Sequence, residues 1–230
     1  MSFIVIEGLD GSGKSTQVKM LCNYLTEKGV NFEYLHFPRT DEAYFGLLIS
    51  RFLRGEMGDI DQVDPWMVAM LFAGDRWAAS KKISSWIESD VLVVVDRYVF
   101  SNIAYQVAKV ANPDEKQKLR TWIYTLEYTM FNIPKPDVSI WLDAPLSFVE
   151  QQLNSNRLGN DRDYLQGVED IHETSINFQQ QVYQEYSECC NQFNDLIRIS
   201  CSDQKGAMMH QDAIFEQLIN RIRNTIKELK

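Results

Sequence analysis

A glycine-rich stretch near the N-terminus, GLDGSGKST at residues 8–16, has the spacing of a phosphate-binding loop. Four residues separate Gly8 from Gly13, and Lys14 and Ser15 follow directly, which fits the pattern GxxxxGK[ST]. Glycines let backbone N–H groups converge on a phosphate, the lysine reaches its outer oxygens, and the serine hydroxyl can bind Mg²⁺. The loop residues predicted to bind ATP are Gly8, Gly11, Ser12, Gly13, Lys14, Ser15 and Thr16.

A carboxylate follows the apolar run of a predicted buried strand. The run VLVVV at residues 91–95 ends in Asp96. Many buried strands end in an aspartate that only caps the next turn, but beside a phosphate-binding loop such a residue is typical of a magnesium site. The sequence therefore predicts Ser15 and Asp96 as groups that hold Mg²⁺.

Two further patterns carry groups suited to a second nucleotide. Phe72 and Arg76 are four residues apart, so on a helix they share a face and offer an aromatic plate and a guanidinium to a base. The same spacing also fits a core phenylalanine beside a surface arginine. Arg97 stands at the end of a predicted strand, where a bidentate donor suits a monophosphate, and Ser101 and Tyr105 share or border its helical face.

These residues require elements that bring them together. Short apolar runs at 3–6, 32–37, 91–95, 138–142 and 196–200 alternate with segments of helical periodicity. This alternation predicts an α/β fold with a doubly wound, parallel, five-stranded sheet flanked by helices. Helices are predicted over 14–28, 43–54, 64–89, 98–111, 114–131, 146–156, 168–193 and 209–229. The polar stretch at 154–167 breaks the pattern and is predicted as a small lid on a single domain of residues 1–230.

Composition limits the class of protein. The 230 residues are 45% hydrophobic, enough for one domain with a sizeable core. The formal charge of −9 disfavours nucleic acid and anionic membranes as partners. The four cysteines lack metal-binding spacing, and no apolar run approaches the ~18 residues of a membrane span. We expect reduced thiols and a cytoplasmic location.

The sequence resembles a known family in four further stretches. They are FPR (37–39), LFAGDRW (71–77), DRYVFSNIAYQ (96–106) and PKPD (134–137). With the phosphate-binding loop, they follow the order found in thymidylate kinases, from residue 4 to about 165. These P-loop nucleoside monophosphate kinases transfer the γ-phosphoryl group of ATP to dTMP and give dTDP for dTTP synthesis. The resemblance implies a P-loop NTPase fold, Mg²⁺ and a homodimer, with which the apolar stretch DPWMVAMLF is consistent.

The resemblance also implies roles for single residues. It implies that thymine stacks on Phe72 and accepts a hydrogen bond at O4 from Arg76. It assigns the phosphate of dTMP to Arg97, and it implies that Asn102 and Tyr105 contact the base and crowd the 2′ position of the sugar. Other residues predicted to bind the acceptor are Asp10, Phe37, Arg39, Ser101 and Tyr164.

Catalysis is predicted to depend on position and charge, because the acceptor is already an anionic phosphate. Gly11 occupies a position where some thymidylate kinases place a catalytic arginine, so we expect the lid to supply that charge through Arg157 and Arg162. Asp10 lies inside the phosphate-binding loop and is expected to hold the 3′-hydroxyl group of the acceptor or a metal-bound water. The predicted catalytic residues are Asp10, Lys14, Arg97, Arg157 and Arg162.

Other functions stay open at this point. The acceptor could be another nucleoside monophosphate. A deoxynucleoside kinase would need a carboxylate base directly after the second strand, where FPR stands instead. An NTP-hydrolysing switch would need a water-positioning residue and a segment that responds to the γ-phosphate, whereas this sequence offers a second nucleotide pocket.

Overall fold

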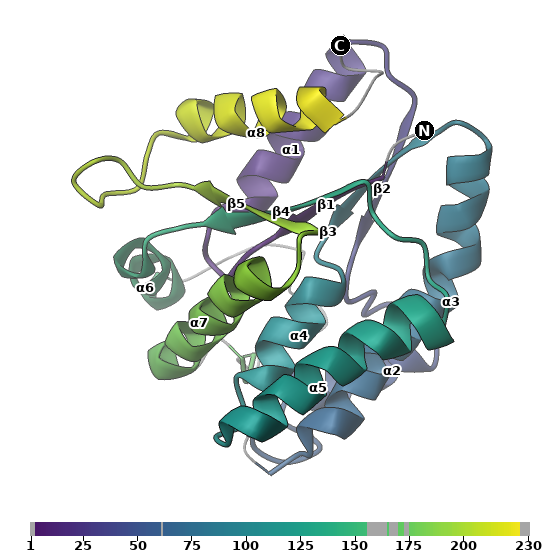
Figure 1. The fold of residues 1–230 in the computed structure, drawn as a ribbon, viewed down its shortest axis with the longest axis vertical. Coiled ribbons are helices and arrows are strands. Elements are labelled where there is room, and N and C mark those ends of the chain that lie inside the picture. The colour runs from purple at the N-terminus through teal and green to yellow at the C-terminus, as the bar shows by residue number, and fades with distance from the viewer. Residues whose placement is uncertain (1–2, 61, 156–164, 166–169, 173–174, 226–230) are drawn as a thin grey trace.

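The protein is built around a five-stranded sheet in which all neighbouring strands are parallel (Figure 1). The computed structural model describes residues 3–60, 62–155, 165, 170–172 and 175–225. The strands are β1 (Phe3–Glu7), β2 (Phe32–His36), β3 (Leu92–Asp96), β4 (Val138–Asp143) and β5 (Leu196–Ser200). Their order across the sheet, β2-β3-β1-β4-β5, confirms the predicted parallel sheet of five strands.

Burial explains why the strands could be predicted. Every residue of β1, β3 and β4 is buried, because these central strands are covered on both faces, and they therefore appear as continuous apolar runs. β2 and β5 are the edge strands, and each has exposed residues. The order of the strands reverses at β1, and α/β proteins bind ligands in the crevice at the carboxyl ends of strands at such a point.

Helices cover both faces of the sheet, as expected for a doubly wound fold (Figure 1). The α-helices of the described residues are α1 (Lys14–Glu27), α2 (Phe45–Leu53), α3 (Pro65–Glu88), α4 (Val99–Val107), α5 (Pro113–Thr125), α6 (Leu146–Asn154), α7 (Ile176–Gln192) and α8 (Gln211–Thr225). α1 and α8 pack together on one face, and α3, α4 and α7 lie on the other. Within the described ranges, no helix is both long enough and apolar enough to span a bilayer.

The prediction of a helix over 168–193 is wrong at its start. The helix begins at Ile176, because the Ser175 side chain caps it by accepting a hydrogen bond from the Phe178 N–H (3.3 Å). The described residues 170–172 lie outside any helix. Two of them, Asp170 and His172, line the cavity described below.

Two other helical predictions need correction. The helix predicted over 98–111 ends at Val107, and the next helix begins at Pro113. Asn112 caps this helix by accepting a hydrogen bond from the Asp114 N–H (2.9 Å), so the chain must leave α4 before that point. The segment predicted over 114–131 changes to a π-helix, η1, over Leu126–Met130.

Candidate active site

A cavity of about 1440 Å³ lies where the sheet's carboxyl ends meet the phosphate-binding loop. Most of the predicted site residues line it: Asp10, Gly11, Gly13, Lys14, Ser15, Thr16, Phe37, Arg39, Phe72, Arg76, Asp96, Arg97, Ser101, Asn102 and Tyr105. Three predicted residues, Arg157, Arg162 and Tyr164, lie outside the described residues. The cavity exceeds the usual range for a single small ligand and is large enough for two nucleotides.

The phosphate-binding loop is held by contacts within itself. Gly13, the N-cap of α1, has a φ of 83°, a left-handed conformation that favours glycine. A side chain at Gly8 would place a Cβ 2.9 Å from Ser12 Oγ, which is too close. Ser12 Oγ and Lys14 Nζ both donate to the Leu9 carbonyl oxygen, at 2.8 and 2.9 Å. The loop is therefore ordered at a helix N-terminus that favours an anion.

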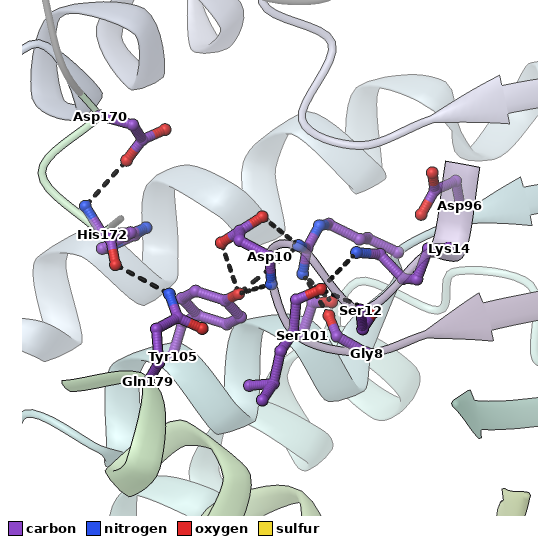
Figure 2. A network of polar contacts seen from close by, with 12 residues as sticks. Gly8, Asp10, Ser12, Lys14, Asp96, Ser101, Tyr105, Asp170, His172 and Gln179 are labelled. Carbon is purple, nitrogen blue, oxygen red and sulfur yellow. Dashed lines mark hydrogen bonds and ion pairs between the residues drawn. The ribbon is translucent and has the colours of Figure 1, made fainter. Parts of the chain in front are cut away.

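The Lys14 ammonium is buried and close to other charges (Figure 2). Burial, together with the positive charge of Arg97, lowers the pKa of Lys14 to about 8. Ser15 and Thr16, by contrast, are exposed to the cavity. An anionic polyphosphate in the loop would favour the charged form of Lys14 and satisfy it.

Asp10, Arg97 and Tyr105 form a compact polar network, of which Figure 2 labels Asp10 and Tyr105. Arg97 Nη2 lies 2.5 Å from Asp10 Oδ1, and the Tyr105 hydroxyl donates to Asp10 Oδ2 at 2.6 Å. Arg97 Nη1 also donates to the Gly8 carbonyl oxygen (2.9 Å) and to Ser101 Oγ (3.3 Å). Burial alone would raise the pKa of Asp10, but the charges of Arg97 and Lys14 hold it well below its usual range. Asp10 is therefore ionised.

Glu7 fixes the start of α4 and was missed in the sequence. The side chain is fully buried at the end of β1, and Oε1 accepts from the Tyr98 N–H (3.0 Å). Oε2 accepts from Ser101 Oγ (2.5 Å) and from the Tyr186 hydroxyl (3.3 Å). Burial raises the pKa of Glu7. These bonds hold the turn in which Arg97 takes a left-handed φ of 66°. The sequence signal for the role of Glu7 is a carboxylate at the end of the apolar run FIVIE.

Arg76 is a core residue, so the alternative of a surface arginine is wrong. It is 2% exposed, and its Nε and Nη2 contact the two oxygens of Glu127 at 2.5 and 2.7 Å. Asn102 Nδ2 donates to the same carboxylate (2.9 Å) and to the Ala69 carbonyl oxygen (3.0 Å). Phe72 lies one turn before Arg76 on α3 and lines the cavity. The structure thus brings Phe72, Arg76 and Asn102 together in the lining of the cavity.

Arg39 is fixed against α3 by Asp75, which the sequence predictions also omitted. The Arg39 backbone N–H and Nε donate to the two carboxylate oxygens of Asp75 at 2.8 and 2.9 Å. Arg39 Nη2 donates to the Asp75 carbonyl oxygen at 2.9 Å. Phe37, two residues earlier, is buried. The FPR segment therefore places a held cation, and not a carboxylate base, beside the cavity.

Asp96 has the environment expected of a magnesium-binding residue. Its Oδ2 lies 3.4 Å from His36 Nδ1, whereas its Oδ1 is buried and has no hydrogen-bond partner among the residues described. Burial would raise the pKa of Asp96, but His36 and Lys14 lower it, so the carboxylate is ionised. Because an ionised, buried oxygen needs a partner, the site fits Mg²⁺ or a metal-bound water together with the Ser15 hydroxyl.

His172 is a second cavity residue that the sequence missed, since it fell inside a predicted helix. Its ring packs on Tyr105 and Phe178, at centroid distances of 5.1 and 5.6 Å. Its backbone N–H donates to Asp170 Oδ1 and its carbonyl accepts from Gln179, both at 2.8 Å (Figure 2). Burial holds the pKa of His172 well below its usual range, so the ring is neutral. Its Nε2 is buried and unpartnered within the described part of the chain.

Comparison with known proteins identifies the family. Residues 6–212 match the sequence model of the family described as thymidylate kinase. The thymidylate kinase of Plasmodium falciparum (isolate 3D7) is 32% identical over 184 residues, which cover 80% of this chain and 75% of that protein. A probable thymidylate kinase of Thermococcus gammatolerans is 29% identical over 217 residues, covering 92% of this chain and 93% of the relative.

The fold comparison agrees with the sequence comparison. The structure of thymidylate kinase from Candida albicans superposes with a TM-score of 0.73 at 25% sequence identity. The match covers 100% of this chain and 93% of that one. The phosphate-binding loop and the parallel sheet thus occur together in a chain that is similar to these enzymes along most of its length. The chain belongs to the thymidylate kinase family.

Proposed function

We propose that this protein transfers the γ-phosphoryl group of ATP to dTMP and releases ADP and dTDP. One observation carries the proposal: the phosphate-binding loop and a second set of nucleotide-binding groups line the same cavity. The second set consists of an aromatic ring, Phe72, and two buried arginines, Arg76 and Arg97. Family membership supports the same reaction.

The loop would bind the donor. Its backbone N–H groups and Lys14 would hold the β- and γ-phosphates of ATP. Ser15 and Asp96 would hold Mg²⁺, which when bound neutralises charge on those phosphates. Thr16 lies in the first turn of α1, the helix end that would face the same phosphates. The loop and β3 would thus place the terminal phosphate of the donor in the cavity.

The remaining groups would bind and orient the acceptor. Arg97 would hold the phosphate of dTMP, and Asp10, ionised and held by Arg97, would accept a hydrogen bond from the 3′-hydroxyl group. Phe72 would stack on thymine, and Arg76 and Asn102 would contact its polar edge. Tyr105 would crowd the 2′ position. No strong base is required, because the attacking oxygen already belongs to an anionic phosphate.

The choice of acceptor tests this proposal. With ATP and Mg²⁺, we expect dTMP to be the best acceptor in a coupled ADP-release assay, and AMP and CMP to be nearly inert. A missing methyl group in an apolar pocket costs ~1–3 kcal/mol, so dUMP should be weaker by about 10- to 200-fold in kcat/KM and still react. Equal kcat/KM for AMP and dTMP would sink the proposal, and turnover of thymidine itself would indicate a deoxynucleoside kinase.

The proposed lid arginines lead to a second prediction. Because Gly11 leaves the loop without an arginine, Arg157 and Arg162 would face the transferring phosphoryl group. We expect Arg157→Ala or Arg162→Ala to lower kcat at least about 10²-fold, since a contact made only in the transition state affects kcat. Calorimetry should find the affinity for dTMP almost unchanged. A near-normal kcat in the double variant would exclude the lid from catalysis.

We also propose a homodimer that buries one face of α3. Met67, Met70 and Trp77 lie at helical spacing on α3 and are 65%, 37% and 52% exposed. Leu47, on the adjoining helix α2, is 57% exposed. Several exposed large apolar side chains on neighbouring helices are typical of a protein interface. Light scattering of the unaltered protein at micromolar concentration should give twice the mass of one chain. The double variant with Met67→Glu and Met70→Glu should have the mass of one chain. If the unaltered protein also has the mass of one chain, the dimer proposal is wrong.

A further inference from the structure

Glu127 contacts two residues of the proposed base pocket without being one of the described residues that line it. Its side chain is 0% exposed. Oε1 accepts from both Arg76 Nη2 (2.7 Å) and Asn102 Nδ2 (2.9 Å), and Oε2 accepts from Arg76 Nε (2.5 Å). Glu127 lies in η1, and such single π-turns often occur at functional sites. One buried carboxylate therefore holds two side chains that come from different helices.

The contacts of Asn102 fix which way its amide points. Its Nδ2 group lies between two groups that can only accept hydrogen bonds, the Glu127 carboxylate and the Ala69 carbonyl oxygen. Turning the amide over would bring Oδ1 against both acceptors and take away the hydrogen bond that each of them accepts from Nδ2. Asn102 Oδ1 therefore points away from them. It is buried and has no partner in the described chain, so a ligand that donates a hydrogen bond would satisfy it.

Arg76 completes the pattern, because a guanidinium can only donate. Glu127 holds it through Nε and Nη2, next to the Asn102 acceptor. The pocket thus offers donors from Arg76 and one acceptor from Asn102. Such a pair matches a base edge that has a carbonyl oxygen beside a ring N–H, as in thymine or uracil. It does not match an edge that has an exocyclic amine beside an unprotonated ring nitrogen, as in cytosine.

We propose that Glu127 is the positioning residue that makes the acceptor pocket select a carbonyl and N–H edge over an amine and ring-nitrogen edge. The contacts of Arg76 and Asn102 with the base rest on the proposed function; the new element is the residue that sets their polarity. A mismatched edge would leave buried polar groups of the protein unpaired. Rejection on that basis can reach ~10⁴- to 10⁵-fold in kcat/KM.

Two nucleotides isolate this edge. dTMP and 5-methyl-dCMP share the ring, the methyl group, the deoxyribose and the phosphate, and differ only at the edge in question. We expect the unaltered protein to favour dTMP by at least about 10³-fold in kcat/KM. In Glu127→Gln, the neutral amide can accept from Arg76 and donate to a turned Asn102 amide. The ratio of kcat/KM for dTMP to kcat/KM for 5-methyl-dCMP should then fall at least tenfold, because kcat/KM decreases more for dTMP than for 5-methyl-dCMP.

A buried ion pair elsewhere in the chain provides the matched control. Glu185 is 3% exposed and contacts Arg120 (2.5 Å) and Lys116 (2.7 Å), and it too is not among the described residues lining the cavity. Glu185→Gln removes a similar buried charge, so it should lower the unfolding temperature while the ratio of the two nucleotides stays that of the unaltered protein. A loss of selectivity in both variants would mean that general loosening, and not Glu127, caused it, which would overturn the inference.

The test separates the inference from the proposed function. Each variant is first checked by thermal unfolding. If Glu127→Gln is unfolded, Glu127→Asp replaces it, since that variant keeps the charge but retracts the oxygens from Asn102, and the ratio should again fall. Absence of dTMP turnover in the unaltered protein would count against the proposed function alone, and calorimetric affinities for the two nucleotides would then decide. If a folded Glu127 variant has a ratio of kcat/KM for dTMP to kcat/KM for 5-methyl-dCMP within twofold of that of the unaltered protein, the inference is overturned.

Discussion

Lys14→Met is expected to lower kcat by about 10³-fold or more, because it removes the cation of the phosphate-binding loop that faces the transferring group. Lys14 lies at the N-terminus of α1, and Asp10 and Asp96 line the same cavity. Without the ammonium, those two carboxylates would face the phosphates with less positive charge to offset them. Steady-state kinetics with saturating ATP and dTMP measures the effect.

The stability of this variant should show that the loss is chemical. Burial lowers the pKa of Lys14 to about 8, so the folded protein holds the charged form at a cost at pH 7. Methionine fills the same space without that cost, although it loses the bond to the Leu9 carbonyl oxygen. The unfolding temperature should therefore fall by no more than a few degrees. Lys81→Met, at an exposed position on α3, is the control for a lost lysine. A kcat within tenfold of the unaltered protein would contradict the role of Lys14.

Arg97→Gln is expected to lower kcat/KM for dTMP by about 10³-fold, for two reasons. The phosphate of the acceptor would lose a charged, bidentate donor, and Asp10 would lose the buried cation 2.5 Å away. Removing one partner of a partly buried ion pair leaves the other charge without compensation, so the remaining carboxylate should take up a proton more readily. Initial rates at low dTMP concentration measure the change.

Arg97→Lys separates charge from geometry. Lysine keeps the charge but cannot reproduce the fork that bonds Gly8, Ser101 and Asp10 together. We expect a loss of at least about 10²-fold in kcat/KM for dTMP. Arg198→Lys is the matched control, because Arg198 pairs with Asp143 but is 49% exposed, and surface pairs contribute little. If Arg97→Lys retains full activity, the site requires only a charge there and the bidentate role is wrong.

The parts of the fold that could be predicted are those whose burial shows as a local run of apolar residues. β1, β3 and β4 are buried in every residue and were visible as apolar runs. The helix over 168–193 was predicted too long, because the periodicity of α7 does not show that Ser175 caps it. The π-helix at Leu126–Met130 has no recognisable local pattern and cannot be told from ordinary helix in the sequence.

The same distinction holds for the site. Lys14, Arg97 and Tyr105 could be predicted because each lies in a short motif whose spacing carries the chemistry. The buried contacts that hold the site's side chains could not be predicted, since the two residues of each contact are distant in the sequence. Arg76 and Glu127 are 51 residues apart, and Ser101 and Tyr186 are 85 apart. Only the packing of α3 against η1 and of α4 against α7 brings these pairs together.

Product analysis tests the central claim, phosphoryl transfer from ATP to dTMP, most directly. ATP labelled on the γ-phosphorus is incubated with the protein and Mg²⁺, with and without dTMP, and the nucleotides are separated by anion-exchange chromatography. The account predicts one labelled dTDP for each ADP formed, and almost no ADP without dTMP. Release of inorganic phosphate from ATP at the same rate with or without dTMP would contradict it, because the protein would then hydrolyse ATP and the second pocket would not receive the phosphoryl group.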